Sequence, residues 1–158
     1  MRLRLPGAAF VLVGFLFLVG SVACGGSPNN PSPTDPSPNL NVPYSQTDLV
    51  VGTGRVAANG NNVTVNYTGW LYNPSAAENK GTQFDSSLSL GRTPLSFRLG
   101  TGQNNLIAGW NQGVVGMAVG GRRRLVLPPS LAYGSGGNGP IPPNATIIFD
   151  IEMLSVTD

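Results

Sequence analysis

The stretch Val63-Thr64-Val65-Asn66-Tyr67-Thr68 alternates apolar and polar side chains residue by residue. This period of two is typical of a β-strand with one buried face, which here would carry Val63, Val65 and Tyr67. The Asn-Gly-Asn-Asn turn at residues 59–62 precedes the stretch and indicates where the strand begins. The sequence therefore predicts a half-buried strand over these residues.

Other parts of the chain repeat this pattern. In residues 147–153 apolar side chains alternate with Asp150 and Glu152. In residues 122–127 the two leucines continue the face of Arg123, so we interpret the run of three arginines as the solvated start of a strand rather than as a basic patch. The remaining segments are expected strands at residues 48–54 and 94–99 and an expected polar loop at residues 73–83.

One segment predicts a helix, beginning after Asn104-Asn105, where an Asn can cap the first turn. Its apolar face would consist of Leu106, Ile107, Trp110 and Val114. Glycines at positions 109, 113 and 116 weaken such a helix, by about 1 kcal/mol each relative to Ala. We therefore expect the helix to be held by packing, with its glycines close to a sheet. Several antiparallel strands and one short helix predict a small α+β domain.

The composition excludes several classes of chemistry. The chain of 158 residues has no histidine and one cysteine, which rules out a Cys/His zinc site, an intramolecular disulfide and histidine-based triads. Its 22 Gly and 14 Pro favour short strands, turns and some non-globular sequence. Without Arg2 and Arg4 the basic and acidic residues are equal in number, so no nucleic-acid partner is expected.

The N-terminus has the features of a secretory signal peptide over residues 1–23. Arg2 and Arg4 precede a short apolar run, and small residues lead to Cys24. Residues 21–24, Ser-Val-Ala-Cys, resemble a bacterial lipobox, in which the cysteine is lipidated, although Ser21 stands where Leu is usual. The alternative is ordinary cleavage after Ala23.

Residues 24–46 are rich in Pro, Asn and Ser and predict a lipid-anchored linker. In a polyproline-like conformation, twenty such residues would span about 60 Å. We expect a folded domain over residues 47–158, exported to the cell envelope and lipid-anchored on the outer membrane or the periplasmic face. The alternative is a soluble periplasmic or secreted protein.

Six motifs follow one another within residues 49–156. They are VNYTGWLY (65–72), QFDSS (83–87), LSFRLG (95–100), NLIAGWNQGV (105–114), GGRRRLVLPPSLAYG (120–134) and GPIPPNATIIFDIEML (139–154). In this order and spacing the series resembles the FKBP-type peptidyl-prolyl cis–trans isomerases, and with the N-terminus it resembles a bacterial secreted lipoprotein member. The resemblance implies a bent antiparallel sheet of about five strands wrapped around one short helix.

The resemblance also implies a site. Trp110 matches the indole at the floor of the family's proline pocket, and its aromatic walls would be Tyr67, Phe84 and Phe149. The backbone N–H of Ile107 and the hydroxyl of Tyr133 match donors to substrate carbonyls. Asp85 matches an acidic residue beside the pocket, or it is a buried acceptor that fixes the local backbone. The implied substrate contacts are Leu95, Leu106 and Ile141.

The chain also departs from the family pattern. Leu95 stands where many members have an aromatic side chain. Residues 88–92 lack the charges often seen there, so the resemblance implies no role for Arg92. Residues 135–143 form a glycine-rich loop that is one residue short. These differences bear on substrate preference.

The implied activity is rotation of Xaa–Pro bonds in exported proteins through a desolvated aromatic pocket, with no cofactor, metal or covalent step. The expected partners are proline-containing polypeptide clients and macrolide ligands of the family, and the expected state is a monomer. The alternatives are a non-catalytic FKBP-fold chaperone or protein-binding module at the cell envelope, and a surface interaction protein that uses the domain for display.

Overall fold

The computed structural model describes residues 42–100 and 106–158. Within them, one antiparallel sheet has the strand order β1-β5-β6-β2-β3, and β4 pairs with β2 beside this path. The strands are β1 (Ser45–Val50), β2 (Asn62–Tyr72), β3 (Lys80–Ser86), β4 (Leu95–Arg98), β5 (Arg122–Leu127) and β6 (Ile147–Thr157). The helical elements are α1 (Ala108–Gly113) and the 3-10 turns η1 (Ala77–Asn79) and η2 (Pro129–Leu131).

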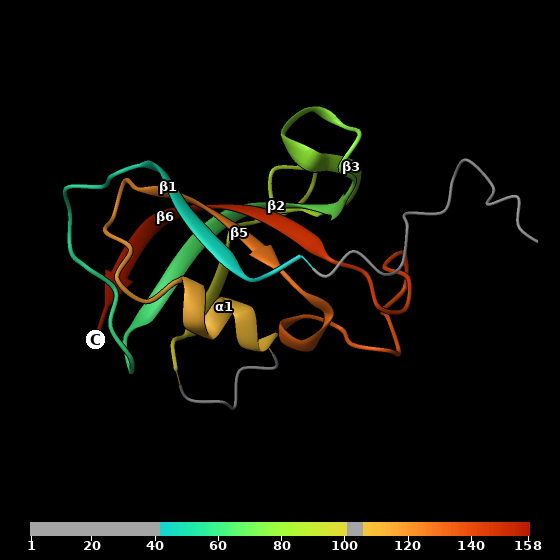
Figure 1. Cartoon of the computed structure of the whole chain (residues 1–158). Coiled ribbons are helices and arrows are strands. Elements are labelled where there is room, and N and C mark those ends of the chain that lie inside the picture. The colour runs from blue at the N-terminus through green and yellow to red at the C-terminus, as the bar shows by residue number, and fades with distance from the viewer. Residues whose placement is uncertain (1–41, 101–105) are drawn as a thin grey trace, which may run out of the picture. The chain divides into compact units, whose positions relative to one another are not determined.

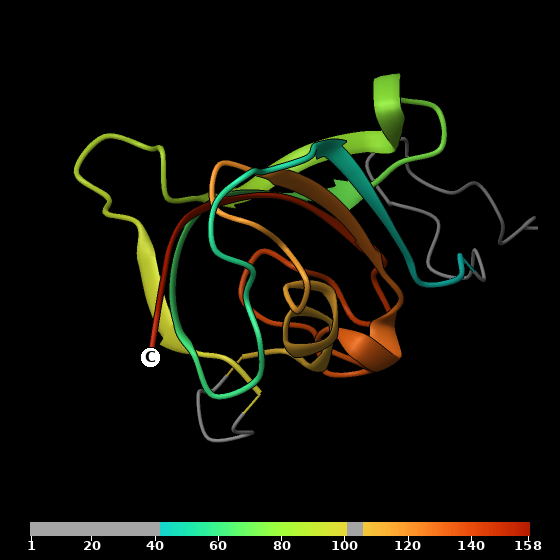
Figure 2. The ribbon, with the colours of Figure 1, turned by 90° about the vertical axis from the view of Figure 1, so that its left-hand side faces the viewer.

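The sheet curves over α1. Figure 1 shows the helix beneath the strands, and Figure 2 shows from the side how the strands bend around it. This arrangement confirms the predicted α+β fold. The expected signal peptide, Cys24 and most of the expected linker lie outside the described residues. Within the ranges 42–100 and 106–158, no helix has the length and apolar character needed to cross a membrane.

Side chains from the central strands form the core between the sheet and the helix. The side chains that are at most 1% exposed and come from β2, β5 and β6 include Val63, Val65, Leu125, Leu127, Ile151 and Met153. They alternate along each strand as the sequence predicts. Full burial of one such side chain contributes about 1.5–3 kcal/mol, so this layer supplies much of the free energy that holds the sheet to the helix.

Two glycines let α1 lie directly on β5. A Cβ atom at Gly109 would be 2.5 Å from Cδ2 of Leu127, and one at Gly113 would be 2.5 Å from Cδ1 of Leu125. Contacts this short do not occur between real atoms, so a larger residue would require the buried leucine side chain or the helix to move. This confirms the expectation that the glycines allow a close approach.

The helix begins later than the sequence predicts. Ile107 is its N-cap, in an extended conformation (φ −61°, ψ 146°), and makes no side-chain capping hydrogen bond. The prediction of an Asn cap is therefore wrong, and Leu106 precedes the helix. Asn104 and Asn105 themselves lie outside the described residues. A six-residue helix with two glycines has little propensity of its own, and its length is set by packing.

Within the described residues the sheet has six strands, one more than the count of about five that the resemblance implied. Strand β3 occupies residues 80–83 of the expected polar loop and continues to Ser86. It lies at the end of the strand order, and its pairing with β2 is irregular near Gly69 and Trp70. Along β3 neighbouring residues share the same burial, since Thr82 and Gln83 are exposed and Phe84 and Asp85 are half-buried, so its sequence lacks the residue-by-residue alternation that reveals the central strands.

The arginine run is not a solvated strand start. The buried Arg123 guanidinium donates to both carboxylate oxygens of Asp48, at 2.6 and 3.2 Å, and to the carbonyl oxygens of Gly113 (2.9 Å) and Val115 (3.1 Å). It therefore joins β1 and β5 to the end of α1. Of the three arginines, only Arg122 is exposed.

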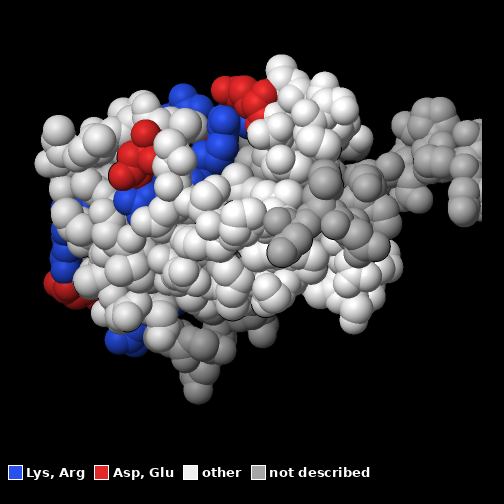
Figure 3. Space-filling view, viewed as in Figure 1, with Lys and Arg blue, Asp and Glu red and all other residues white. Residues whose placement is uncertain are grey.

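Arg124 forms a second ion pair, with Asp150 on β6. Its Nε and Nη2 atoms donate to the two carboxylate oxygens at 2.7 and 3.0 Å, and Lys80 Nζ donates to the same carboxylate at 2.8 Å. Burial raises the pKa of Asp150, but the two cations outweigh this and lower that pKa below its usual value. Figure 3 shows the charged side chains of one face in mixed blue and red groups, without an extended patch of one sign.

We expect Arg123→Met to lower the free energy of unfolding by about 2 kcal/mol, because it leaves Asp48 and two carbonyl groups without their donor. Arg122→Met is the matched control, since Arg122 is exposed, and should change stability by no more than about 0.5 kcal/mol. Urea unfolding of both variants measures the difference. Equal stability of the two variants would contradict the role given to Arg123.

Candidate functional site

Five aromatic side chains from five elements form one cluster, which we call the aromatic cluster. Its members are Tyr67 (β2), Phe84 (β3), Phe97 (β4), Trp110 (α1) and Phe149 (β6). The strand order explains how they meet, because β6 and β3 flank β2, β4 pairs with β2 as well, and α1 lies beneath the sheet.

Trp110 lies at the middle of the aromatic cluster. Its ring centroid is 5.2 Å from Tyr67 and 5.1 Å from Phe149, both edge-to-face, and 5.9 Å from Phe97. Trp110 and Phe149 are 3% and 4% exposed, whereas Tyr67, Phe84 and Phe97 are half-buried. The cluster thus has a buried floor and a partly open rim. Edge-to-face pairs of this kind each contribute about 0.5–1.5 kcal/mol beyond their burial, so the rings are fixed in place.

Gly69 makes room for two of these rings. It lies opposite Phe149 in the pairing of β2 with β6. A Cβ atom at Gly69 would be 2.6 Å from the Phe84 ring and 2.7 Å from the Phe149 ring. The two rings therefore meet over the glycine, with centroids 5.5 Å apart at 89°. A larger residue at position 69 would separate them.

A carboxylate lies at the rim of the aromatic cluster. Asp85 accepts hydrogen bonds from the Tyr67 hydroxyl at 2.6 Å, from Arg92 Nη2 at 2.6 Å and from the Ser86 backbone N–H at 2.9 Å. Asp85 therefore does act as an acceptor that fixes the backbone, as one of the two sequence interpretations proposed. Burial and the neighbouring Asp85 raise the pKa of Tyr67, while Arg92 opposes them, so the Tyr67 hydroxyl keeps its proton at neutral pH.

Two backbone or hydroxyl donors of the predicted site have no acceptor among the described residues. The Ile107 carbonyl accepts the N–H of Trp110 at 3.0 Å, but the Ile107 N–H itself donates to no described group. The half-buried Tyr133 follows η2, and within residues 42–100 and 106–158 its hydroxyl makes no hydrogen bond. The buried Trp110 Nε1 likewise has no partner in the described part of the chain.

The other predicted residues pack against the same core. Leu106 and Leu95 are half-buried beside it, and Ile141 belongs to it at 5% exposure. Ile141 is held by two backbone hydrogen bonds with Asn138, both of 2.9 Å. Every predicted site residue of the domain thus belongs to the core or packs against it, except Asp85, which is joined to it through Tyr67. The individual roles of these residues stay predictions.

Sequence reasoning missed two members of the site. Phe97 supplies the ring on the β4 side, where Leu95 alone was considered; both have odd numbers in one strand and so share its face. Arg92 received no role, yet it holds Asp85. The sequence did contain a signal for this ion pair: Arg92 is the only charged residue of the loop and follows Asp85 by seven residues.

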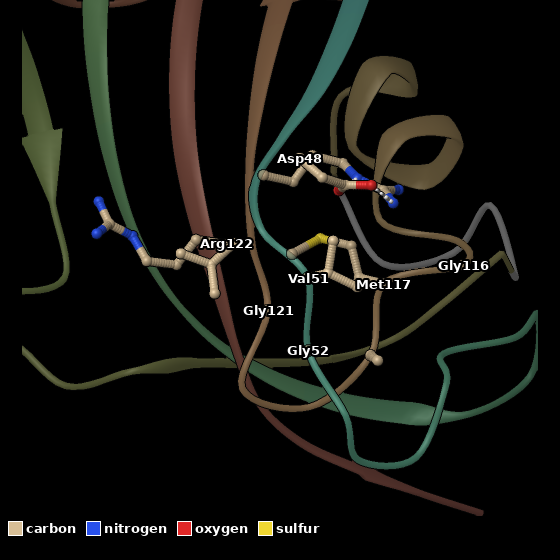
Figure 4. A pocket seen from close by; sticks show the side chains of 10 residues that line it. Asp48, Val51, Gly52, Gly116, Met117, Gly121 and Arg122 are labelled. Carbon is tan, nitrogen blue, oxygen red and sulfur yellow. Dashed lines mark hydrogen bonds and ion pairs between the residues drawn. The ribbon is translucent and has the colours of Figure 1, made fainter.

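A small pocket elsewhere in the domain is not part of this site. Figure 4 shows it between the end of β1 and the connection from α1 to β5, with Asp48, Gly52 and Met117 among its lining residues. Its volume of about 50 Å³ has room for a few water molecules only. It contains no residue of the aromatic cluster.

The fold and the aromatic cluster together define a class of protein: a small α+β domain whose candidate site is a buried indole surrounded by aromatic rings, two of them half-buried beside a carboxylate. The FKBP-type peptidyl-prolyl cis–trans isomerase family matches residues 53–154, about two-thirds of the chain, and the chain belongs to this family. The protein is therefore an isomerase of the peptidyl-prolyl cis–trans class.

Relatives and solved structures agree with this assignment. The FK506-binding protein of Neisseria meningitidis serogroup B is 48% identical over 110 residues, covering 69% of this chain and 92% of the relative. The crystal structure of FkpA from Escherichia coli is 38% identical with a TM-score of 0.60, and the match covers 72% of this chain and 48% of FkpA. The structure of AtFKBP13 is 40% identical with a TM-score of 0.58, covering 71% and 91%. This chain thus spans about half of FkpA.

We expect opposite shifts of the Tyr67 pKa from two substitutions. Arg92→Gln should raise this pKa further, because the cation that stabilises the phenolate is gone, and Asp85→Asn should lower it, because the repelling carboxylate is gone. Alkaline titration of phenolate absorbance, as a difference from Tyr67→Phe, measures both shifts. Arg55→Gln, which alters only a distant exposed ion pair with Asp158, is the control. A fall of the pKa in Arg92→Gln would contradict the arrangement.

Proposed function

We propose that the aromatic cluster binds the proline ring of a polypeptide and that the domain rotates Xaa–Pro bonds of exported proteins there. The observation that carries this proposal is the buried Trp110 floor together with two residues that pack against the same core, Ile107 and Tyr133, whose N–H and hydroxyl have no acceptor among the described residues. An apolar floor suits the proline ring, and the donors suit the carbonyl groups that flank it.

The chemistry requires a change of environment rather than a reactive group. Rotation about a peptide bond has a barrier of about 18–20 kcal/mol, because the resonance of the planar amide must be broken. The planar amide is strongly polar, and the twisted amide has lost much of that charge separation. A floor of aromatic rings solvates the planar form less well than water does, so it favours the twisted form in relative terms.

The two donors would supply orientation. A substrate carbonyl held by the Ile107 N–H and another held by the Tyr133 hydroxyl would keep the peptide bent about its proline. Tyr67 is already engaged with Asp85, at 2.6 Å, so its hydroxyl serves the site by fixing the ring rather than by binding the substrate. On this proposal no proton is transferred, and the polar groups act through their positions.

We expect Tyr133→Phe to lower kcat/KM for a Leu-Pro tetrapeptide about tenfold, which corresponds to the loss of one hydrogen bond of about 1.4 kcal/mol. Cis–trans relaxation of the peptide, followed without a coupling protease, measures the rate. Tyr72→Phe is the matched control, because Tyr72 ends β2 outside the aromatic cluster and its hydroxyl has no partner among the described residues.

Each result of this assay decides one point. Relaxation by the folded wild-type protein no faster than in buffer would overturn the isomerase proposal for this chain. An unchanged rate in Tyr133→Phe would remove Tyr133 from its donor role only. FK506, the ligand in the name of the Neisseria meningitidis relative, is the inhibitor to include, and we propose that it occupies the same aromatic cluster.

We also propose that the domain works at the cell envelope on a lipid tether. The support comes from the sequence alone: the basic and apolar start of the chain, the Ser-Val-Ala-Cys motif at residues 21–24 and the proline-rich residues after it. A tether of that composition would hold the domain away from the membrane, within reach of polypeptides that have just been exported.

We expect Cys24→Ala to release the protein from the membrane fraction of a bacterial host, because Cys24 is the only cysteine and the only residue available for the lipid. Carbonate-washed membranes and mass spectrometry of the N-terminal peptide measure anchoring. Ser27→Ala, three residues further on, is the control and should stay with the membrane. A wild-type protein found in the soluble fraction would show that cleavage follows Ala23 without lipidation.

A further inference from the structure

Two leucines project from the loop that joins β3 to β4, residues 87–94. Leu88 is 67% exposed and Leu90 is 105% exposed, so neither contributes its side chain to the core. Figure 2 shows this yellow-green loop extending from the sheet between β3 and β4. We call Leu88 and Leu90 the leucine ledge. Single exposed leucines are ordinary on protein surfaces, whereas here two stand two residues apart on one short turn.

The leucine ledge is held by hydrogen bonds at its base. The Ser87 N–H donates to the Tyr67 carbonyl at 3.0 Å, and the Leu88 N–H donates to the Ser86 hydroxyl at 3.1 Å. The Arg92 N–H closes the turn by donating to the Ser89 carbonyl at 3.0 Å. Because the loop is fixed in this way, a partner that binds the leucines does not have to order it first.

The same loop is tied to the aromatic cluster. Arg92 donates to Asp85, which accepts the Tyr67 hydroxyl, each at 2.6 Å. Leu90 is two residues from Arg92, a separation of at most about 7 Å along the chain. An extended polypeptide advances about 3.3–3.6 Å per residue, so a chain with its proline in the cluster needs only a few more residues to reach the ledge.

A groove on the sheet next to the loop adds to this surface. Its volume is about 450 Å³, and Leu88, Trp70 and Ile151 contribute to its lining. The charges in it are of both signs, with Lys80 and Arg122 against Asp150 and Glu152. The lining is mixed, with polar Asn66 and Thr68 beside Leu88 and Trp70, and its balanced charge favours neither an anion nor a cation.

We propose that the leucine ledge is an auxiliary docking point for unfolded client polypeptides, which binds apolar side chains a few residues from the proline held in the aromatic cluster. This inference rests on the proposed function of that cluster. The partner is an unfolded chain with aliphatic or aromatic side chains near a proline. A short proline peptide ends before the ledge and does not use it.

The test compares a short and a long substrate in the double variant Leu88→Ser/Leu90→Ser. For a Leu-Pro tetrapeptide we expect kcat/KM within twofold of the wild type. For a disulfide-free protein whose refolding is limited by prolyl isomerisation, we expect kcat/KM to fall about tenfold. Leu49→Ser is the control, because this exposed leucine lies on β1, at the other end of the strand order, and should change neither rate.

Three results would overturn the proposal: an unchanged rate on the protein substrate, an equal loss on both substrates, or an equal loss in Leu49→Ser. If the wild type fails to turn over the tetrapeptide, the proposed function fails, and the ledge is then tested by binding alone. Fluorescence anisotropy of a labelled 20-residue peptide with leucines around one proline should show about tenfold weaker binding in the double variant. Equal binding by both proteins would overturn the proposal in that case too.

Discussion

The packing of α1 on β5 depends on two glycines that face leucine side chains. Gly109 lies against Leu127 and Gly113 against Leu125, at separations that leave no space for a Cβ atom. Trp110 lies between the two glycines in sequence, so the distance between helix and sheet also sets the depth of its indole. The contacts of that indole with rings on β2, β4 and β6 follow from this distance. Glycine lowers the intrinsic stability of the helix, but it allows the close contact between α1 and β5.

A helix of six residues needs support at both ends, and here the support differs. At its start Ile107 offers no side-chain cap, and its N–H has no acceptor among the described residues. At its end the guanidinium of Arg123 donates hydrogen bonds to the carbonyl groups of Gly113 and Val115. The same guanidinium forms an ion pair with Asp48. The end away from the proposed substrate is therefore fixed by a buried cation. The end beside it has a backbone donor without an acceptor in the described part of the chain.

The sequence was sufficient for the central strands and the aromatic set, but not for the edges and the ion pairs. Residues 63–68 alternate because one face of β2 is buried, and Phe149, Ile151 and Met153 alternate with Asp150 and Glu152 although β6 is buried on both faces as far as Ile151. Strand β3, at the end of the strand order, shows no such alternation in its sequence. The ion pair of Arg123 was missed for a different reason: its partner Asp48 is 75 residues away, and only the pairing of β1 with β5 brings the two together. Phe97 could have been found, since it shares a strand face with Leu95.

Asp85 shows how polar groups are used around an apolar site. Its carboxylate accepts hydrogen bonds from three donors, the Tyr67 hydroxyl, Arg92 and the Ser86 N–H. These bonds hold the rim of the aromatic cluster in place. A mechanism that works by desolvation needs such fixed geometry more than it needs a tuned proton affinity. In the loop of residues 87–94, Arg92 supplies the contact with Asp85, and the residues before it have no part in the proposed chemistry. Their outward side chains can change without altering the chemistry, and in this chain two of them are leucines, which suit a client that is itself unfolded and apolar.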